Sequence, residues 1–266
     1  MSEFSSLRVE REGPVARVTL ARSEVRNAFN EVMIEELTQV FLSFGDDRGT
    51  RVVLLEGEGP IFSAGADIEW MRRAGNWSKL ENEADAERMA RMLRAIDRCL
   101  LPVVARVQGA AIGGGVGLVA ASDIAIAAED AVFSLAEVKL GILPSVVSPH
   151  VLRAIGARQA RRYFLTGDRF SAAEARRIGL VHEVVPAPEL AAACDRTIGA
   201  LLTSGPEAVR FAKRLIEEVA GKSPDEAMSV TVRTIAERRA SEEAKEGLTA
   251  FLEKRPPSWA PKKPSQ

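Results

Sequence analysis

The segment from Val103 to Ala121 constrains the fold most. An apolar stretch, Val103 to Val107, leads into Gly113-Gly114-Gly115, and an apolar run ending at Ala121 follows. This order predicts a buried strand, a tight glycine turn and a helix. Glycine lets another backbone or a ligand approach closely. The unpaired N–H groups of a first helical turn favour an anion or a developing oxyanion. Close packing of elements is the alternative use of such glycines.

Gly115 to Ala120 also fits the loose dinucleotide-binding pattern G-x-G-x-x-A. That pattern needs a strand directly before it and an acidic residue about 20 positions later. Glu137 stands near that position, after a short strand-like segment. However, the three consecutive glycines and their place near mid-chain, rather than in a first βα unit, argue against a dinucleotide site.

Composition limits the protein class and the partners. With 266 residues, of which 46% are hydrophobic, the chain can form one large domain with a helical appendage. Its 36 basic and 37 acidic residues balance, so net charge suggests neither nucleic acid nor an anionic membrane as a partner. Aromatic residues make up only 5%, which offers little stacking surface for RNA.

Cysteines and terminal sequence indicate the compartment. Cys99 and Cys194 lie far apart and form neither a metal-binding spacing nor a disulfide framework. The stretch from Met1 to Ser6 lacks the apolar core of a signal peptide. No uncharged apolar run reaches the roughly 18 residues of a membrane span. We therefore expect a soluble, cytoplasmic protein without a metal ion or membrane contact.

The periodicity predicts alternating strands and helices in the first two thirds. Residues 7–20 alternate around Gly13-Pro14, as in a hairpin. Residues 31–44 carry an amphipathic helical stripe, and residues 51–56 are typical of a buried strand. A second small-residue turn, Ile61 to Asp67, precedes a probable helix.

The later segments complete an α/β pattern. Residues 76–100 are mostly helical by pattern, with a mobile loop expected in their first part. Residues 123–127 and 131–134 resemble strands, and the chain beyond Ala157 is helical apart from a short strand at 180–185. Helix starts are predicted at Pro186, Pro188, Pro206 and Pro224. Strand–helix alternation followed by a helical C-terminal third indicates the α/β class.

Several separated motifs point to one family. They are Arg26-Asn27-Ala28-Phe29-Asn30, Phe62 to Ile68, Gln108 to Gly117, Asp123 to Ala127, Phe133 to Gly141, and Glu246-Gly247 to Lys254-Arg255. In this order they resemble the enoyl-CoA hydratase/isomerase, or crotonase, superfamily over nearly the whole chain. The resemblance implies a crotonase-like spiral of ββα units, with residues 1–200 as the catalytic and acyl-CoA-binding core. Residues 201–266 would then form a helical trimerisation region, giving a homotrimer or a dimer of trimers.

The resemblance also implies where the substrate binds. The thioester carbonyl of acyl-CoA would lie between the backbone N–H groups of Ala64 and Gly114, each worth roughly 3–4 kcal/mol of barrier. Coenzyme A is part of the substrate, so no separate cofactor is expected. The remaining coenzyme contacts implied are Arg26 and Ala28 (pantetheine and phosphates), Ala66, Asp67 and Ile68 (adenine), and Phe251 and Lys254 (nucleotide of an adjacent subunit). Lys254 could instead cap the last helix.

One catalytic carboxylate of the family pattern is present and the other is missing. Hydratases of the family commonly use two glutamates, and the later one matches Glu137. Its apolar neighbours in sequence would raise its pKa into a useful acid–base range; the alternative is an exposed or salt-bridged glutamate near Lys139. The first glutamate is replaced by Gly117. Glycine within a helix costs about 1 kcal/mol relative to alanine, so the missing side chain suggests a gain such as room for a branched acyl group.

The missing glutamate leaves several functions open. The motifs most resemble bacterial hydratases of branched enoyl-CoAs such as 3-methylglutaconyl-CoA, and Arg72 or Arg73 could pair with a distal carboxylate unless both are simply solvated. Weak candidates for a second acid are Ser145, Ser148 and His150. The sequence thus predicts an enoyl-CoA hydratase. The alternatives are a Δ3,Δ2-enoyl-CoA isomerase using Glu137 alone, thioester hydrolysis or decarboxylation on the same scaffold, and, in another class, a non-catalytic CoA- or RNA-binding trimer.

Overall fold

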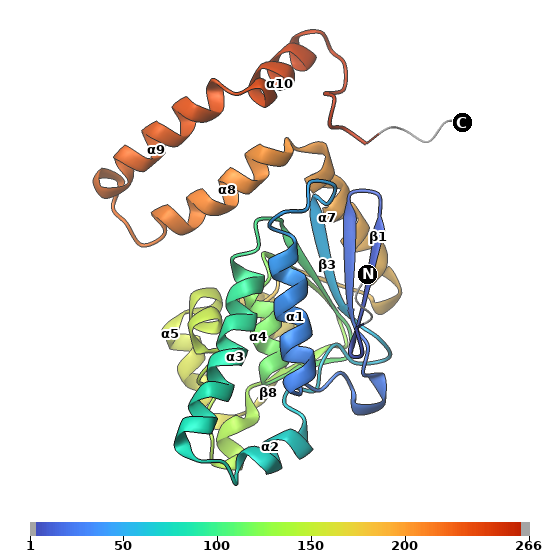
Figure 1. Cartoon of the computed structure of the whole chain (residues 1–266), viewed down its shortest axis with the longest axis vertical. Helices are drawn as coiled ribbons and strands as arrows, with labels where there is room; N and C mark the ends of the chain where they lie inside the picture. The colour runs from blue at the N-terminus through green and yellow to red at the C-terminus, as the bar shows by residue number, and fades with distance from the viewer. Residues whose placement is uncertain (1–3, 262–266) are drawn as a thin grey trace.

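The computed structural model describes residues 4–261, which form two β-sheets covered by helices (Figure 1). Expectations about residues 1–3 and 262–266, including the start of the Met1 to Ser6 stretch, lie outside this range. Among the described residues, no helix is both long and apolar enough to cross a membrane.

The larger sheet contains six strands in the order β1-β2-β3-β4-β6-β9. These are β1 (Leu7–Glu12), β2 (Val15–Leu20), β3 (Val52–Gly57), β4 (Val103–Val107), β6 (Ile124–Ala128) and β9 (Glu183–Val185). The predicted hairpin pairs β1 and β2 antiparallel, and all the other neighbours are parallel. Val53 and Leu55 of β3 face one hydrophobic cluster, and Val52 and Leu54 face another. Burial on both faces explains the apolar run at this strand.

The smaller sheet lets the chain run as a spiral that passes repeatedly from one sheet to the other. It contains β5 (Ala110–Ile112), β7 (Val132–Ser134) and β8 (Arg169–Ser171). Strand β4 leads directly to β5, and β6 to β7, so successive turns of the chain add one strand to each sheet. Gly109 lies at the bend from β4 to β5 with φ +63°, and a Cβ there would be 2.0 Å from the Pro60 carbonyl oxygen. The short strand β5 was not predicted.

The described residues form ten α-helices, some of which cover the two faces of the larger sheet. They are α1 (Glu31–Ser43), α2 (Ile68–Ala74), α3 (Lys79–Asp97), α4 (Gly114–Ala121), α5 (Ser148–Thr166), α6 (Ala172–Ile178), α7 (Leu190–Thr203), α8 (Pro206–Val219), α9 (Pro224–Arg239) and α10 (Glu242–Leu252), with 3-10 turns η1 (Ser23–Val25), η2 (Ala136–Leu140) and η3 (Ala187–Glu189). Helices α1, α3 and α4 lie side by side on one face, and α7 packs on the other (Figure 1).

The prediction of a mobile loop in the first part of residues 76–100 is wrong, because most of that part is helical. Ser78 and Glu81 form a capping box, in which each side chain bonds the backbone N–H of the other residue. This box satisfies N–H groups at the helix start, so α3 begins at Lys79. The first half of α3 is therefore helical rather than a loop.

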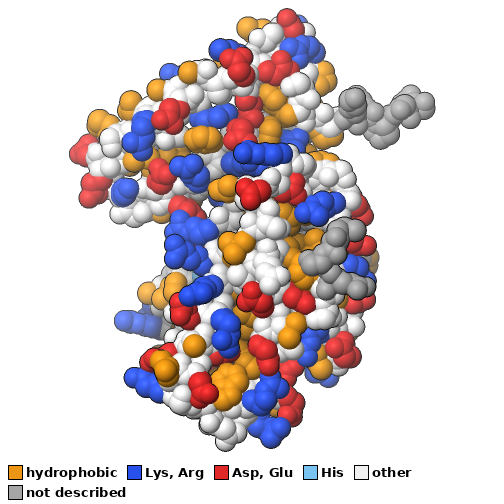
Figure 2. Space-filling view, viewed as in Figure 1, with side chains coloured by type: hydrophobic (Ala, Val, Ile, Leu, Met, Phe, Trp, Pro, Cys, Tyr) orange, Lys and Arg blue, Asp and Glu red, His pale blue; other side chains and the backbone are white. Residues whose placement is uncertain are grey.

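Helices α8, α9 and α10 form an arm that extends away from the sheets (Figure 1). Ala227 and Ala250 are its only buried residues between positions 206 and 252. Figure 2 shows hydrophobic side chains among the charged ones along the arm; Met228, Val232, Ile235, Phe251 and Leu252 are exposed. The predicted division at residue 200 falls within α7 and remains a prediction.

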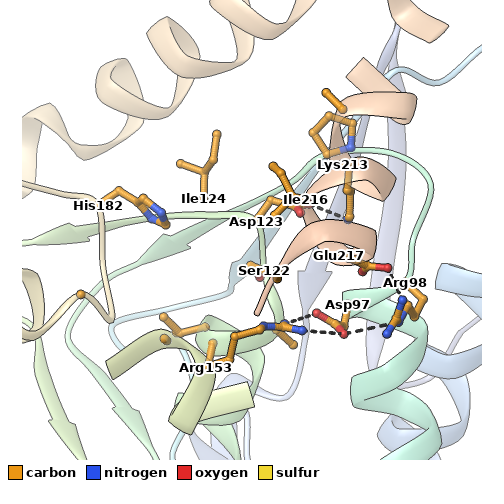
Figure 3. Close-up of a pocket in the computed structure, with 18 of the residues that line it drawn as sticks. Asp97, Arg98, Ser122, Asp123, Ile124, Arg153, His182, Lys213, Ile216 and Glu217 are labelled. Carbon is orange, nitrogen blue, oxygen red and sulfur yellow. Dashed lines mark hydrogen bonds and ion pairs between the residues drawn. The ribbon is translucent and has the colours of Figure 1, made fainter. Parts of the chain in front are cut away.

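The arm is attached to the core largely by ion pairs. A cavity of about 670 Å³ separates α8 from the C-terminal end of α4 (Figure 3). Across it Lys213 Nζ lies 2.6 Å from Asp123 Oδ2, and Arg98 pairs with Glu217. Burial raises the pKa of Asp123, against the attraction of Lys213. The Asp123 carboxylate therefore depends on this lysine.

We predict that Lys213→Ala destabilises the fold by roughly 1–3 kcal/mol. Removing one partner of a fully buried pair costs about 3–5 kcal/mol, and the Asp123 side chain retains 28% of its exposure. Urea unfolding at neutral pH measures the effect. Arg214→Ala is the control, because it removes an exposed pair with Glu218 and should cost no more than about 1 kcal/mol. Equal losses in the two variants would contradict the role of Lys213.

Candidate active site

The two small-residue turns meet in space. Ser63 and Ala111 form an isolated parallel bridge between them. Gly65 has φ +88°, and a Cβ there would lie 2.7 Å from the Ile112 carbonyl oxygen. Only glycine allows this approach, so the two backbones are held in direct contact.

The backbone hydrogen bonds of the first turn correct one prediction. The Ala64 N–H donates to the Arg26 carbonyl oxygen at 2.9 Å, and the Asp67 N–H donates to that of Phe29 at 2.7 Å. Ala64 therefore has no free N–H for a substrate, and its predicted role is wrong. The Ala66 N–H has no acceptor among residues 4–261. Because Ala66 lines the adjacent pocket, it is the available donor on this turn.

The second turn supplies the matching donor. Gly113 has φ +51°, a conformation that favours glycine, and its N–H donates to the Ser134 carbonyl oxygen at 2.8 Å. Gly114 is the first residue of α4, lines the same pocket, and has an N–H without an acceptor in the described chain. It also lies at the positive end of the helix dipole. This geometry supports the donor role predicted for Gly114.

The pocket beside these turns has a volume of about 360 Å³ and is mostly apolar. Its walls come from α2, α3, the two turns, η2 and the segment 142–147. Among the described lining residues, Asp85 and Glu137 are the only charged ones. A pocket of this kind suits an acyl chain better than a charged ligand.

Glu137 lies on η2, directly over the glycine turn. Its Oε1 is 3.1 Å from the position that a Cβ on Gly113 would take. Its Oε2 is buried and has no hydrogen-bond partner among the described residues. Burial raises the pKa of this carboxyl, while a bond from its own backbone N–H opposes the rise. Within residues 4–261, no ion pair joins Glu137 to Lys139, and Glu137 lines the pocket.

Val147 fills the space of the missing first glutamate. A Cβ on Gly117 would lie 2.4 Å from Val147 Cγ1 and 3.5 Å from Leu93 Cδ2. Val147 itself lines the pocket. The expectation that Gly117 leaves room for a branched acyl group is therefore wrong, because a neighbouring side chain uses that room.

The arginines suggested for a distal carboxylate point elsewhere. Arg72 pairs with Glu69 at 2.8 Å on the exposed face of α2, and Arg73 pairs with Glu31. Neither lines the pocket. The alternative, that both arginines belong to a solvent-exposed helix face, describes them better.

Of the three weak candidates for a second acid, only Ser145 lines the pocket. Ser148 begins α5. His150 faces Asp97 at 3.9 Å, and burial lowers its pKa despite that carboxylate. Ser148 and His150 therefore lie outside the pocket wall.

Of the coenzyme contacts predicted on the first half of the chain, Ala66 and Ile68 line the pocket, whereas Arg26, Ala28 and Asp67 do not. Ile68 lines the pocket with 79% of its surface exposed, Arg26 is exposed, and Ala28 is buried. The Asp67 side chain caps α2 and pairs with Arg22. Burial opposes its ionisation, but the hydrogen bond from Arg22 and those from the helix start outweigh it and lower the pKa of Asp67. The coenzyme contacts remain predictions.

Phe251 and Lys254 lie far from this pocket. Phe251 is on α10, at the opposite end of the molecule from α2 (Figure 1), and neither residue is part of the pocket wall. Phe251 is 80% exposed. Any contact with a nucleotide would therefore be made in another subunit, as the family resemblance implies.

Sequence reasoning missed the α3 wall of the pocket, formed by Asp85 and Met89. A signal was available. Asp85 occupies the inward stripe of α3 with Met89, Leu93 and Ile96, where spacings of three and four residues recur. A carboxylate in an otherwise apolar stripe indicates a role other than packing, such as contact with a ligand.

We predict that Gly117→Ala destabilises the fold by about 1–3 kcal/mol through overpacking, although alanine normally favours a helix by about 1 kcal/mol. Val147→Ala removes the colliding methyl groups. A double-mutant cycle by chemical unfolding should therefore show coupling of at least about 1 kcal/mol. Strictly additive effects would show that Val147 does not fill the Gly117 site.

The comparisons agree with this geometry. Residues 10–262 match the family described as enoyl-CoA hydratase/isomerase. The chain is 34% identical to a crotonyl-CoA hydratase of Syntrophomonas wolfei, covering 95% of this chain and 96% of the relative. It is 35% identical to a mevalonyl-coenzyme A hydratase of Aspergillus fumigatus, covering 92% and 91%. A crystal structure of an enoyl-CoA hydratase from Shewanella pealeana superposes with a TM-score of 0.93 at 43% identity, covering 97% of each chain. The chain therefore belongs to the enoyl-CoA hydratase/isomerase family and has the crotonase fold.

Proposed function

We propose that this enzyme adds water across the 2,3-double bond of an uncharged enoyl-CoA, with Glu137 as the acid–base group. The observation that carries the proposal is the convergence of three groups on one apolar pocket. These are the N–H groups of Ala66 and Gly114 and the Glu137 carboxylate, none of which has a competing partner there. Residues 10–262 match an enzyme family, and this match favours catalysis over a non-catalytic CoA- or RNA-binding trimer.

The reaction follows from these positions. Glu137 removes a proton from water, and the water oxygen bonds to Cβ of the enoyl group. The double-bond electrons move toward the thioester carbonyl, whose oxygen becomes an enolate oxygen held by the Ala66 and Gly114 N–H groups. Protonated Glu137 then returns its proton to Cα, and the carbonyl re-forms. The raised pKa of Glu137 serves both steps, since it makes the carboxylate a better base and keeps the proton transferable.

The charges of the pocket-lining residues limit the acyl groups that the pocket can bind. Relatives of similar identity carry names for different acyl groups, so identity does not select one. Among the described residues, no Arg, Lys or His lines the pocket, and Asp85 would repel a distal carboxylate. An uncharged chain, straight or branched, therefore fits better than a glutaconyl group such as that of 3-methylglutaconyl-CoA.

An isomerase remains the second candidate. Proton transfer between two carbons needs one carboxylate, and Val147 stands where the second would be. The same oxyanion donors would stabilise its dienolate. A product assay separates the two reactions.

We also infer that the enzyme assembles as a trimer or a dimer of trimers. The arm exposes apolar side chains, including Val232, Ile235 and Phe251, and the predicted contact of Phe251 with the nucleotide requires an adjacent subunit, because α10 lies far from the pocket. Light scattering should give three or six times the mass of the chain; the mass of a single chain would overturn the inference. A cytoplasmic location stays a prediction, which cell fractionation tests.

We predict that the pure enzyme hydrates crotonyl-CoA and that Glu137→Gln lowers kcat by at least about 100-fold, because positioned acid–base groups contribute 10²–10⁴-fold. Product analysis should show lower kcat/KM for 3-methylglutaconyl-CoA than for crotonyl-CoA. Conversion of only a 3-enoyl-CoA would establish the isomerase instead.

The pH dependence provides a second readout of Glu137. The base must be ionised, so kcat/KM should rise with pH through a midpoint above the ordinary glutamate value of 4.5. A raised folded-state pKa also means that the ionised form destabilises the fold above that pKa, a penalty absent below the unfolded value. Glu137→Gln should therefore unfold at no lower temperature than the wild type at neutral pH. A lower unfolding temperature would point to a structural role.

A further inference from the structure

Asp85 is a buried carboxylate on the wall of an otherwise apolar acyl pocket. It is 7% exposed, whereas residues 81–84 and 86–88 of the same helix are all exposed. Met89, Leu93 and Ile96 continue its stripe along α3 with apolar side chains. Burying a charge is unfavourable unless it is paired and hydrogen-bonded, so the position would suit leucine better if packing were its only role.

The hydrogen bonding of Asp85 is incomplete. Oδ1 accepts a bond from Arg88 at 2.6 Å, and the arginine side chain is 45% exposed. Oδ2 accepts no hydrogen bond from the residues that the structure describes. Since Asp85 lines the pocket, this oxygen is available to a ligand there.

The position of Asp85 corresponds to the distal part of an acyl chain. Met89 Cε lies 3.0 Å from the position of a Cβ on Gly114, so this turn of α3 contacts the oxyanion site. Asp85 is one helical turn nearer the start of α3, which is about 6 Å along the helix axis. It therefore lies away from the oxyanion donors while still lining the same pocket.

A second polar group without a partner lines the same pocket. Trp70 is 6% exposed, and its indole N–H is buried with no acceptor among residues 4–261. An ammonium group could bond Asp85 but would leave this donor unpaired, and a carboxylate would be repelled by Asp85. A hydroxyl donates to a carboxylate without bringing a charge into the pocket and can also accept from an N–H, so its chemistry suits both groups.

We propose that Asp85 is a specificity-determining residue that accepts a hydrogen bond from a hydroxyl group on the distal part of the acyl chain. The substrate class is then an uncharged 2-enoyl-CoA that carries a chain-end hydroxyl. This inference rests on the proposed hydratase function and adds the acyl group to it.

The test compares matched substrates. Pairs of 2-enoyl-CoAs with four, five and six acyl carbons, each with and without a terminal hydroxyl, are supplied to the wild type, Asp85→Asn, Asp85→Leu and Glu87→Gln. Glu87 is the matched control, because it carries the same charge on α3, pairs with Arg91 on the exposed face and is not part of the pocket wall. The readout is the ratio of kcat/KM for the hydroxylated substrate to that for its plain partner.

We expect the wild-type ratio to exceed one and to peak at one chain length. Asp85→Leu should lower that peak roughly ten- to hundredfold, the range for a hydrogen bond to a charged group. Asp85→Asn, which keeps an acceptor, should lower it less, and Glu87→Gln should leave it unchanged. Thermal unfolding of both Asp85 variants checks that the fold persists.

Two results would overturn the proposal. One is a flat wild-type ratio at all chain lengths. The other is an equal loss of kcat/KM for both members of each pair in Asp85→Leu and Asp85→Asn, which would assign Asp85 to the chemistry or to folding. Both leave the hydratase intact. Absence of hydration of every substrate by the wild type would instead remove the proposed function, and this inference with it.

Discussion

The contact between two backbone turns is the constraint on which the rest of the site depends. Gly65 lies against the Ile112 carbonyl, and Ser63 bridges to Ala111. This contact places the N–H groups of Ala66 and Gly114 on one pocket. Since the donors are backbone groups fixed by the sheets, they need no reorganisation when charge develops on the substrate. The fold itself therefore positions the two donors of the proposed oxyanion site, and side chains line the pocket around them.

The two carboxylates of the pocket differ in how far their charge is compensated by neighbouring groups. Glu137 has one oxygen over the glycine turn and another that is buried without a partner, an arrangement that burial makes unfavourable for the ionised form. Asp85 is partly compensated by Arg88 at the surface. Stability alone would favour apolar residues at both positions. Their presence in an apolar wall indicates that ligand binding and chemistry, rather than folding, account for these residues.

Much of this architecture could be predicted from the sequence. Strong periodicity predicted α1, β3 and the hairpin, and the family motifs predicted the fold; they also pointed to Glu137 and Gly114, which the structure places on one pocket and whose roles stay predictions. The oxyanion donor on the first turn was placed at Ala64 instead of Ala66, because residue types do not show which N–H of a small-residue run points inward. The use of the Gly117 space by Val147 was likewise hidden, since it depends on contact between segments about 30 residues apart. The α3 wall was missed because its many charged residues resembled a solvated loop.

A hydratase with one glutamate needs that residue to serve as both base and acid. In this chain the need follows from packing. Val147 Cγ1 lies 2.4 Å from the position that a Cβ at residue 117 would take, and Val147 also lines the pocket, so any side chain at position 117 would require this wall to shift. Restoring a glutamate at that position alone would place its Cβ against Val147. The replacement of the first glutamate by Gly117 and the shape of the pocket beside Val147 are therefore one structural feature, and in our proposal substrate selection depends on Asp85, a polar group elsewhere on the pocket wall.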